Sequence, residues 1–403
     1  MRRKRWTIIS FSVSLLLIFA FVPAFAQPEA PKTLKIGVVY EITGPMATTG
    51  ERFGWGLKKG VEAINKDGGI HVKEFDKKIP IELLESDHAT NAEKAVLQAE
   101  YLNGKGVVAL IGTTSFCVGG PGVIEKHRLP TLMSHAAIET PFRLGYRYLF
   151  SNFPMFSDQG RTFIGFLDSL PKEQRPKSIA LFEEMYDAGI EACKYAEQGA
   201  IASGYKAIRV KFQRLTKDMS AAILDAKKAG TEVAFALAIT PDAMLLVKQA
   251  KELDYNPKAI FILLGATDRR AWATLGKDGD YVYSTNDFHW SVGWPGAKEL
   301  NALYEAERKE KPYEGCGYGY ASIRIVADAI QRAGSLDRKK IRDALAATDM
   351  MTVVGPMKFR ANGLRELEYM NVTQYIKGVE TMVFPEKWRE RLPIYPTPKW
   401  NER

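Results

Sequence analysis

The chain has 403 residues, of which 46% are hydrophobic and 26% charged, as is typical of globular proteins. The formal charge of +9 falls to +5 when the four basic residues at positions 2–5 are set aside. No run of basic residues interleaved with aromatic ones follows residue 26, which argues against nucleic-acid binding. The length exceeds what a single hydrophobic core usually serves, so we expect two lobes.

The first 26 residues have the pattern of an export signal. The basic residues at positions 2–5 precede an apolar stretch from Ile8 to Val22, and Ala24-Phe25-Ala26 provides the small-x-small pattern that signal peptidase cuts. The apolar stretch of 15 residues is shorter than the roughly 20 that span a bilayer, which argues against a retained anchor. We expect cleavage near Ala26 and a soluble protein in the periplasm.

The cysteines and histidines predict neither a disulfide framework nor a metal site. Cys117, Cys193 and Cys316 are odd in number and lie 76 and 123 residues apart, so we expect buried free thiols. The five histidines lack the spacing of metal ligands. No cofactor is expected.

From residue 34 onward, short β-branched runs alternate with amphipathic helical stretches, which is typical of βα units in a mainly parallel sheet. Apolar residues three or four apart, such as Phe53, Leu57, Val61 and Ile64, indicate that each helix presents one face to the sheet. The strands expected in the first half are 35–40, 79–85, 107–112 and 131–134.

The same rhythm restarts after an irregular stretch at 149–158, as though a second lobe begins. Its expected strands are 178–182, 207–212, 232–237 and 259–264, and its expected helices lie near 187–203, 218–229, 241–254 and 268–275. A second irregular stretch at 284–295 precedes a mostly helical region. The fold class that this order predicts is α/β, with two doubly wound lobes.

Extended segments and prolines mark the last part of the chain. Residues 353–359, the turn Ala361-Asn362-Gly363 and residues 370–376 predict a hairpin-like pair. The tail after Pro385 is too rich in proline for a helix, so we expect it to lie along the surface.

Motifs for catalysis are weak. The strand at 107–112 runs into Thr113-Thr114-Ser115-Phe116, but the Gly-x-Ser-x-Gly elbow of hydrolases, the dinucleotide fingerprint and the Walker motif are absent. Polar turns at the carboxyl ends of parallel strands are where such sheets place ligands. Ser115 lies at one such end, just before a helix, where it could hold a carboxylate or only cap the helix.

Several segments carry a family resemblance. The first strand reads Lys35-Ile36-Gly37-Val38-Val39-Tyr40 and is followed by Thr43-Gly44-Pro45, and the first helix ends in Asn65-Lys66-Asp67-Gly68-Gly69-Ile70. Tyr186-Asp187-Ala188-Gly189 follows the first strand of the second half, and Gly355-Pro356 lies near the end. Together these segments resemble the periplasmic branched-chain amino acid binding proteins, the leucine/isoleucine/valine-type receptors of ABC importers, over essentially the whole chain after residue 26.

The resemblance implies a type I periplasmic binding protein fold, in which two lobes joined by three crossings close on a ligand. The irregular stretches near 149–158, 284–295 and 359–370 are where the crossings should lie. The expected domains are 27–152 plus 287–360 for lobe 1 and 153–286 plus 361–403 for lobe 2.

The resemblance also implies the ligand-binding residues. In the first lobe, the turn after the third strand would hold a ligand carboxylate, and the turn after the next strand would supply further contacts. In the second lobe, an aromatic residue would close over the ligand and an acidic one would pair with an amino group. The matching positions are Thr114, Ser115, Phe116, Ala136, Ala137, Ile138, Tyr186, Ile239, Thr267 and Asp268.

The chain departs from the family pattern where the ligand is chosen. Ile138 replaces a hydroxyl residue, and Ile239 stands where a second aromatic is expected. If Asp268 faces the cleft, an α-amino acid fits; if it caps the following helix, the ligand lacks an amino group. Phe288, Trp290 and Trp294, with Tyr186 and Phe116, could line a pocket for an aromatic or aliphatic carboxylate or could pack between the lobes.

The predicted function is binding without chemistry. The protein would capture a branched-chain amino acid or a related small carboxylate or amide, or a carboxylate without an amino group, and present it to the membrane permease subunits of an ABC transporter. We expect a monomer, no nucleic-acid partner and no enzyme activity. A sensor on the same fold is a second binding hypothesis, and a secreted serine hydrolase using Ser115 is the alternative from a different class.

Overall fold

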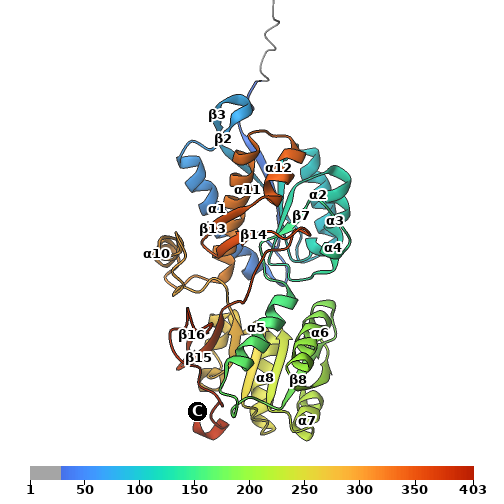
Figure 1. Ribbon diagram of the computed structural model, residues 1–403, viewed down its shortest axis with the longest axis vertical. Coiled ribbons are helices and arrows are strands. Elements are labelled where there is room, and N and C mark those ends of the chain that lie inside the picture. Colours follow the sequence, from blue (N-terminus) through green and yellow to red (C-terminus); the bar gives the residue numbers. More distant parts are fainter. Residues whose placement is uncertain (1–28) are drawn as a thin grey trace, which may run out of the picture.

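The strands of the protein form two main sheets, one in each of two lobes stacked along the long axis of the molecule (Figure 1). The computed structural model describes residues 29–403, so the predicted export signal at 1–26 lies outside the described residues. The first sheet has the strand order β4-β1-β5-β6-β7 and the second has the order β16-β15-β12-β11-β10-β8-β9. Within residues 29–403, no helix is long and apolar enough to cross a membrane.

The first sheet consists of parallel strands whose carboxyl ends share one edge. It is built from β1 (Leu34–Tyr40), β4 (Ile81–Asp87), β5 (Ala109–Thr113), β6 (Thr131–Ser134) and β7 (Leu149–Ser151). These strands read as near-continuous apolar runs because helices cover both faces of a parallel sheet. The covering helices from the first part of the chain are α1 (Ala47–Lys66), α2 (Ala92–Gly104), α3 (Phe116–His127) and α4 (Thr140–Arg143).

Three later helices complete the first lobe: α10 (Ala297–Arg308), α11 (Glu314–Ala333) and α12 (Arg338–Ala346). The backbones of α1 and α11 touch, which requires glycine at the contact. A Cβ on Gly319 would lie 2.0 Å from the carbonyl oxygen of Phe53, and one on Gly56 would lie 2.0 Å from that of Cys316. The chain therefore returns from the second lobe to finish the core of the first.

The second sheet has five parallel strands and an antiparallel edge pair. The parallel strands are β8 (Ser178–Glu184), β9 (Lys206–Phe212), β10 (Val233–Ala238), β11 (Ala259–Leu264) and β12 (Tyr283–Thr285), and the edge pair is β15 (Val372–Ile376) with β16 (Val379–Phe384). Its helices are α5 (Phe156–Ser169), α6 (Asp187–Ala202), α7 (Ser220–Lys228), α8 (Thr240–Glu252) and α9 (Arg269–Ala273). Aromatic packing fixes α5 on the sheet, where the Phe163 ring lies 4.7 Å from Phe235 and 4.9 Å from Phe261.

The chain passes between the lobes three times, at 152–155, 286–296 and 359–371. Arg365 of the third crossing ties the other two together. Its Nη1 lies 3.3 Å from Asp287 Oδ2 in the second crossing and 3.4 Å from the carbonyl oxygen of Asn152 in the first. The predicted α/β fold with a three-crossing hinge is confirmed; the domain limits at 152/153, 286/287 and 360/361 stay a prediction.

Most predicted strands and helices are present within a few residues of their expected limits, and two predictions are wrong. Residues 353–359 do not pair with 370–376. Instead β13 (Asp349–Thr352) pairs with β14 (Gly355–Lys358) in the first lobe, and β15 pairs with β16 in the second. The second hairpin turns at Lys377 and Gly378, whose φ angles of 53° and 75° suit a two-residue hairpin turn. The Asn362-Gly363 turn closes only a local loop, in which Phe359 bridges to Arg365.

The strand predicted at 79–85 is the second error of this kind. The chain forms β3 (Lys77–Ile79), which pairs with β2 (Ile70–Val72), and then β4 begins at Ile81. Pro80 separates the two strands because it has no N–H to donate to a ladder.

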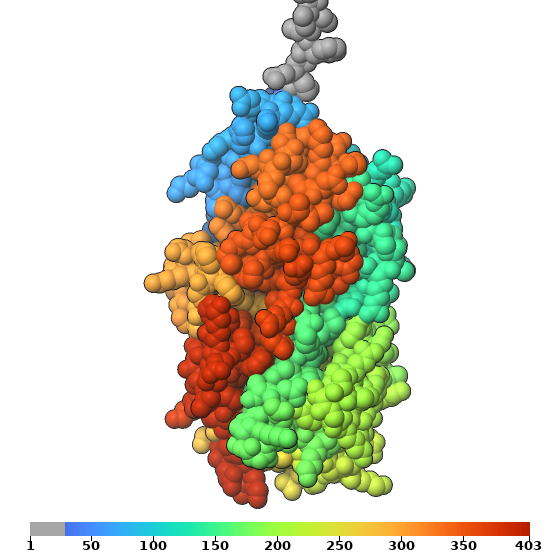
Figure 2. All heavy atoms as spheres, viewed as in Figure 1, coloured from blue at the N-terminus to red at the C-terminus, as the bar shows by residue number. Residues whose placement is uncertain are grey.

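The predictions for the cysteines and for the C-terminal tail agree with the structure. Cys117, Cys193 and Cys316 are free and buried. Past Pro385 the chain contains only a short 3-10 turn at Trp400–Glu402, and it packs on the second lobe through the Trp400 indole, which donates to the Tyr255 carbonyl oxygen at 3.0 Å. Figure 2 shows this segment, in red, covering one flank of that lobe.

Candidate ligand-binding cleft

The turns at the carboxyl ends of the two sheets contact each other between the lobes. On one side, Arg52 of α1 pairs with Asp268, which follows β11, at 3.5 Å. On the other side, the backbone N–H of Glu139 donates to Glu191 Oε1 of α6 at 3.2 Å, and the Tyr195 hydroxyl donates to Glu139 Oε2 at 2.9 Å. These contacts mark the candidate cleft, where the two lobes face each other.

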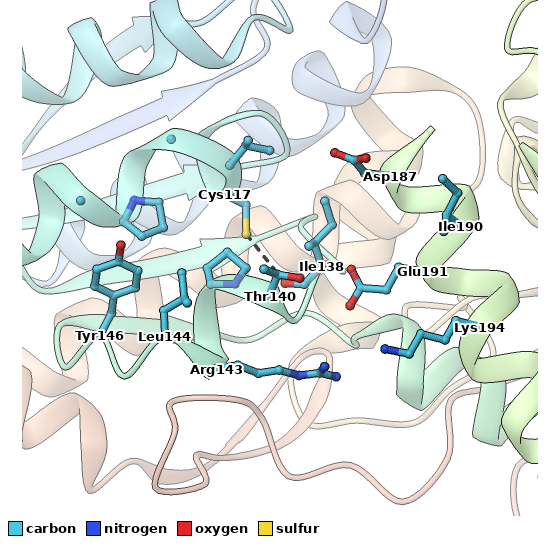
Figure 3. A pocket seen from close by; sticks show the side chains of 15 residues that line it. Cys117, Ile138, Thr140, Arg143, Leu144, Tyr146, Asp187, Ile190, Glu191 and Lys194 are labelled. Carbon is cyan, nitrogen blue, oxygen red and sulfur yellow. Dashed lines mark hydrogen bonds between the residues drawn. The ribbon is translucent and has the colours of Figure 1, made fainter. Parts of the chain in front are cut away.

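A cavity of about 500 Å³ opens between α3 and α4 of the first lobe and α6 of the second (Figure 3). Its volume is in the range of small-molecule sites. Ile138 and Leu144 supply apolar wall, and Glu191 and Lys194 of α6 supply charge. In Figure 3 the Glu191 carboxylate turns toward Ile138, while Arg143 reaches from α4 toward α6. The cavity can hold an apolar group beside a polar one.

A buried polar cluster lies at the carboxyl edge of the first sheet, next to the predicted Thr114. Glu41 follows β1, His88 follows β4, and Thr113 ends β5; all three side chains are buried. Glu41 Oε2 accepts hydrogen bonds from the hydroxyls of Thr113 and Thr114, the latter at 3.3 Å, and lies 3.3 Å from His88 Nε2. Within residues 29–403, Glu41 Oε1 has no partner.

The hydrogen bonds of this cluster fix its charge. The Thr90 N–H donates to His88 Nδ1 at 3.0 Å, so the ring proton lies on Nε2 and points at Glu41 and Thr113. Burial alone would raise the pKa of Glu41, but the hydrogen bonds from His88 and Thr113 outweigh it and lower that pKa. Glu41 is therefore an ionised carboxylate held by hydrogen-bond donors.

His135 follows β6 at the same edge. Its φ of 50° is unusual for a residue with a Cβ, and its ring lies 5.5 Å from Phe53 and 5.0 Å from Phe153. Burial lowers its pKa to about 4, against the opposing attraction of Glu41, so the imidazole is neutral at pH 7. Nδ1 has no hydrogen-bond partner in the part of the chain that the structure describes.

The predicted residues of the first lobe lie together at this edge, but not all of their side chains point the same way. Thr114 and Ser115 are half-buried, and Ser115 makes no capping hydrogen bond although α3 starts at the next residue. The Phe116 side chain is fully buried against Gly112 and Gly120, so a contact from this residue to a ligand would use its main chain.

The turn after β6 is divided between core and cavity. Ala136 and Ala137 are buried in the cores of the first and second lobes respectively. Ile138 is half-buried and lines the cavity, and its carbonyl oxygen lies 3.9 Å from Cys117 Sγ. Ile138 is thus the predicted residue of this turn that meets the cavity.

The predicted residues of the second lobe follow the carboxyl ends of β8, β10 and β11. Tyr186 is 46% exposed, and its ring lies 4.6 Å from the guanidinium carbon of Arg214. Ile239 is half-buried before α8, and the Thr267 hydroxyl donates to the Leu264 carbonyl oxygen at 2.7 Å. Asp268 accepts from the Ala271 N–H at 3.4 Å, so it does cap α9, and it also faces Arg52.

The structure does not gather the five aromatic residues considered as a pocket. Phe116 and Phe288 are buried in separate apolar clusters of the first lobe. The Trp294 ring packs 4.8 Å from Trp388 of the C-terminal segment, which is contact between the lobes. Trp290 lies beneath Arg269, 4.9 Å from its guanidinium carbon.

Sequence reasoning missed Arg52, Glu41, His88 and His135. Three of them had a usable signal, since Glu41, His88 and His135 each directly follow a parallel strand, as the predicted residues do. Arg52 lies inside α1, and nothing in its local sequence marks it.

These features define the class of protein. Two α/β lobes, three crossings and a cavity between the lobes form the architecture of a solute-binding protein. A family model described as "Periplasmic binding protein" matches residues 33–379. The chain belongs to this family, whose members are periplasmic solute-binding proteins of ABC transporters and not enzymes. The alternative of a hydrolase acting through Ser115 is therefore wrong.

Individual relatives are similar over nearly the whole chain. The Leu/Ile/Val-binding protein homolog 7 of Brucella suis biovar 1 (strain 1330) is 25% identical over 397 residues, covering 94% of this chain and 96% of that protein. A leucine-binding protein of Thermotoga maritima MSB8 has a TM-score of 0.78 at 20% identity, covering 87% of this chain and 98% of its own. A fatty acid ABC transporter substrate-binding protein of Thermomonospora curvata has a TM-score of 0.76 at 20% identity, covering 91% and 95%. They confirm the type I periplasmic binding protein fold.

Proposed function

We propose that this solute-binding protein captures a branched-chain amino acid or a related small carboxylate between its lobes and delivers it to the permease of an ABC importer. The observation that carries this proposal is the cavity of about 500 Å³ at the inter-lobe contact, bounded by α3 and α4 of the first lobe and α6 of the second. A pocket shared by two lobes lets binding energy be used to close them.

Two features support a ligand with both polar and apolar parts. Thr114 and Ser115 place hydroxyl groups at the carboxyl edge of the first sheet, before the N-terminus of α3. Ile138 and Ile190 give the cavity apolar wall. A small carboxylate with an aliphatic tail matches both.

Closure would work as a hinge motion about the three crossings. Arg365 holds Asn152 and Asp287 in a buried cluster, so the crossings move as one unit. The ligand would add contacts between the lobes, and the closed form would be recognised by the permease. The mature protein, cut near Ala26, would act in the periplasm as a monomer.

A second candidate ligand class is a carboxylate without an amino group. It is favoured by the observation that Asp268 caps α9 through Oδ1, which is the role expected if the ligand lacks an amino group. The fatty-acid receptor among the structural neighbours shows that the same fold serves a protein named for such a ligand.

The experiment is a thermal-shift screen of the mature protein after unfolding and refolding to remove carried ligand. The panel contains leucine, isoleucine and valine, their amides, and aliphatic and aromatic carboxylates. A solute that binds only the folded state at a hundredfold excess over its Kd adds about 2.7 kcal/mol to stability and raises Tm. A panel without any shift overturns the proposal.

A further inference from the structure

Arg52 is an arginine of the cleft whose charge is poorly paired. It projects from α1 of the first lobe, and its side chain is 13% exposed. Among residues 29–403, its guanidinium makes one hydrogen bond, from Nη2 to Asp268 Oδ1 at 3.5 Å. A guanidinium has five N–H donors, so most of them are unused.

Tyr313 holds this guanidinium in a fixed place. The guanidinium carbon of Arg52 lies 3.3 Å from the centroid of the Tyr313 ring, which is stacking contact. Arg269 also lies on this ring, at 4.0 Å, but its charge is satisfied by the buried Glu380 at 3.3 Å and by the carbonyl oxygen of Pro312 at 2.8 Å. The two arginines share one aromatic ring, yet Arg269 has several hydrogen-bond partners and Arg52 has one among the described residues.

Asp268 is a weak partner for Arg52. Its Oδ1 serves both the Arg52 Nη2 and the N–H of Ala271, at 3.5 and 3.4 Å, and its side chain is 28% exposed. A carboxylate facing a guanidinium squarely makes two bonds of roughly 2.7–2.9 Å. The pair therefore leaves room for a better acceptor on Arg52 and for a donor on Asp268.

The position of Arg52 connects it to the predicted site. Its partner Asp268 is one of the predicted residues, and a Cβ on Gly315 would lie 3.2 Å from Arg52 Cβ and 3.3 Å from His135 Cε1, so Arg52 and His135 pack around the same glycine. His135 begins the turn that ends at Ile138, which lines the cavity.

We propose that Arg52 binds the carboxylate of the solute and that the Arg52–Asp268 pair opens to admit a zwitterion, whose ammonium group goes to Asp268 as the family resemblance already implies. The inference deepens the proposed function and rests on it. Closure removes the cleft from water, and buried charges must then be paired. A zwitterion pairs both residues, whereas a ligand with only a carboxylate leaves Asp268 unpaired. Asp268 can keep its bond to Ala271 and accept the ammonium group through Oδ2.

The test measures Kd by titration calorimetry for three matched probes: L-leucine, L-leucinamide and 4-methylpentanoate. In Arg52→Gln, leucine should bind roughly 100-fold more weakly, because two charge-assisted hydrogen bonds are lost, while leucinamide should change less than about threefold. Asp268→Asn should weaken leucine and leucinamide but not 4-methylpentanoate. Arg308→Gln, which removes an exposed arginine paired with Glu51 of α1, should change none of the three.

The ratio between probes separates recognition from folding. If Arg52 had only a structural role, Arg52→Gln would weaken the binding of leucine and of leucinamide equally, and this outcome overturns the inference. Arg52→Lys keeps the charge without the planar fork and should give an intermediate loss for leucine. Binding of 4-methylpentanoate but not of leucine by the wild-type protein also overturns it, and the proposed function then stands. Absence of binding by any probe, together with an empty thermal-shift panel, overturns both.

Discussion

The two lobes bury acidic residues at their facing edges in opposite ways. In the first lobe, Glu41 is surrounded by donors from Thr113, Thr114 and His88, and the hydrogen bonds from His88 and Thr113 lower its pKa despite burial. In the second lobe, burial raises the pKa of Glu184 and of Asp242, since Arg214 offsets it only in part. The first edge is thus an ionised, hydrogen-bonded anchor, and the second gains stability by taking up protons.

The difference suggests a division of labour between the lobes. A buried hydrogen-bond network holds its backbone turns in place, and the turn carrying Thr114 and Ser115 belongs to that network through Thr114. The second edge presents the half-exposed Tyr186 and Asp268. We infer that the first lobe provides a preformed surface and that the second lobe closes onto it.

The largest expected effect tests the hinge that joins the two edges. Arg365→Met leaves Asp287 buried without its cation, which should lower the free energy of unfolding by about 3–5 kcal/mol. Urea denaturation at pH 7 measures it. Arg360→Met is the control from the same crossing; this exposed arginine lies 3.9 Å from Asp158, and the loss should stay below about 1 kcal/mol. Equal losses would show that the Arg365 cluster does not hold the crossings.

The anchor of the first edge is tested by Glu41→Gln. Loss of charge-assisted hydrogen bonds should lower the free energy of unfolding by about 2 kcal/mol at pH 7. Because the folded-state pKa of Glu41 is lowered, its contribution is present above the pKa of the unfolded chain and disappears as pH falls. Wild type and variant should therefore converge in urea titrations toward pH 3. The exposed Glu93→Gln should match wild type throughout, and a pH-independent Glu41 difference would refute the ionised anchor.

The second edge should respond to pH with the opposite sign. The folded-state pKa of Glu184 is raised, so the native protein binds the extra proton and loses stability as pH rises above the pKa of the unfolded chain. Glu184→Gln removes this loss and should gain about 1 kcal/mol relative to wild type at pH 8, with little difference at pH 4. The same urea titrations measure it. If Glu184→Gln were less stable than wild type at pH 8, the ionised Glu184 carboxylate would stabilise the fold as Glu41 does, and the contrast between the two edges would be refuted.

The smallest expected effect lies at the contact between the edges. Tyr195→Phe removes the hydroxyl that donates to Glu139 across the cavity rim at 2.9 Å. We expect solute binding to weaken by roughly threefold, as for one hydrogen bond, with Tm nearly unchanged. Calorimetric titration with the tightest solute of the screen measures it, and Tyr205→Phe, a tyrosine bonded to Asp168 within the second lobe, is the control. Equal affinity of wild type and Tyr195→Phe for the solute would show that this hydrogen bond does not contribute to the closed state.

The sequence predicted the order of strands and helices well because parallel strands are continuous apolar runs. It failed where one local residue decides: Pro80 splits a run in two, and Lys377-Gly378 rather than Asn362-Gly363 makes the tight hairpin. For the candidate site, the sequence predicted which turns lie at the facing edges. It did not predict which residues meet across the lobes, because Arg52 and Asp268 are 216 residues apart and meet only through the packing of the lobes.

The central claim is that a solute is held between the lobes, and the most direct measurement is the distance between them. Spin labels at Leu97→Cys on α2 and Leu224→Cys on α7, both exposed sites, report it by pulsed dipolar spectroscopy, and the native thiols are buried. We expect the tightest solute of the screen to replace a broad inter-lobe distance distribution with a narrow one. An unchanged distribution at saturating solute would contradict the claim, since the solute would then bind one lobe alone.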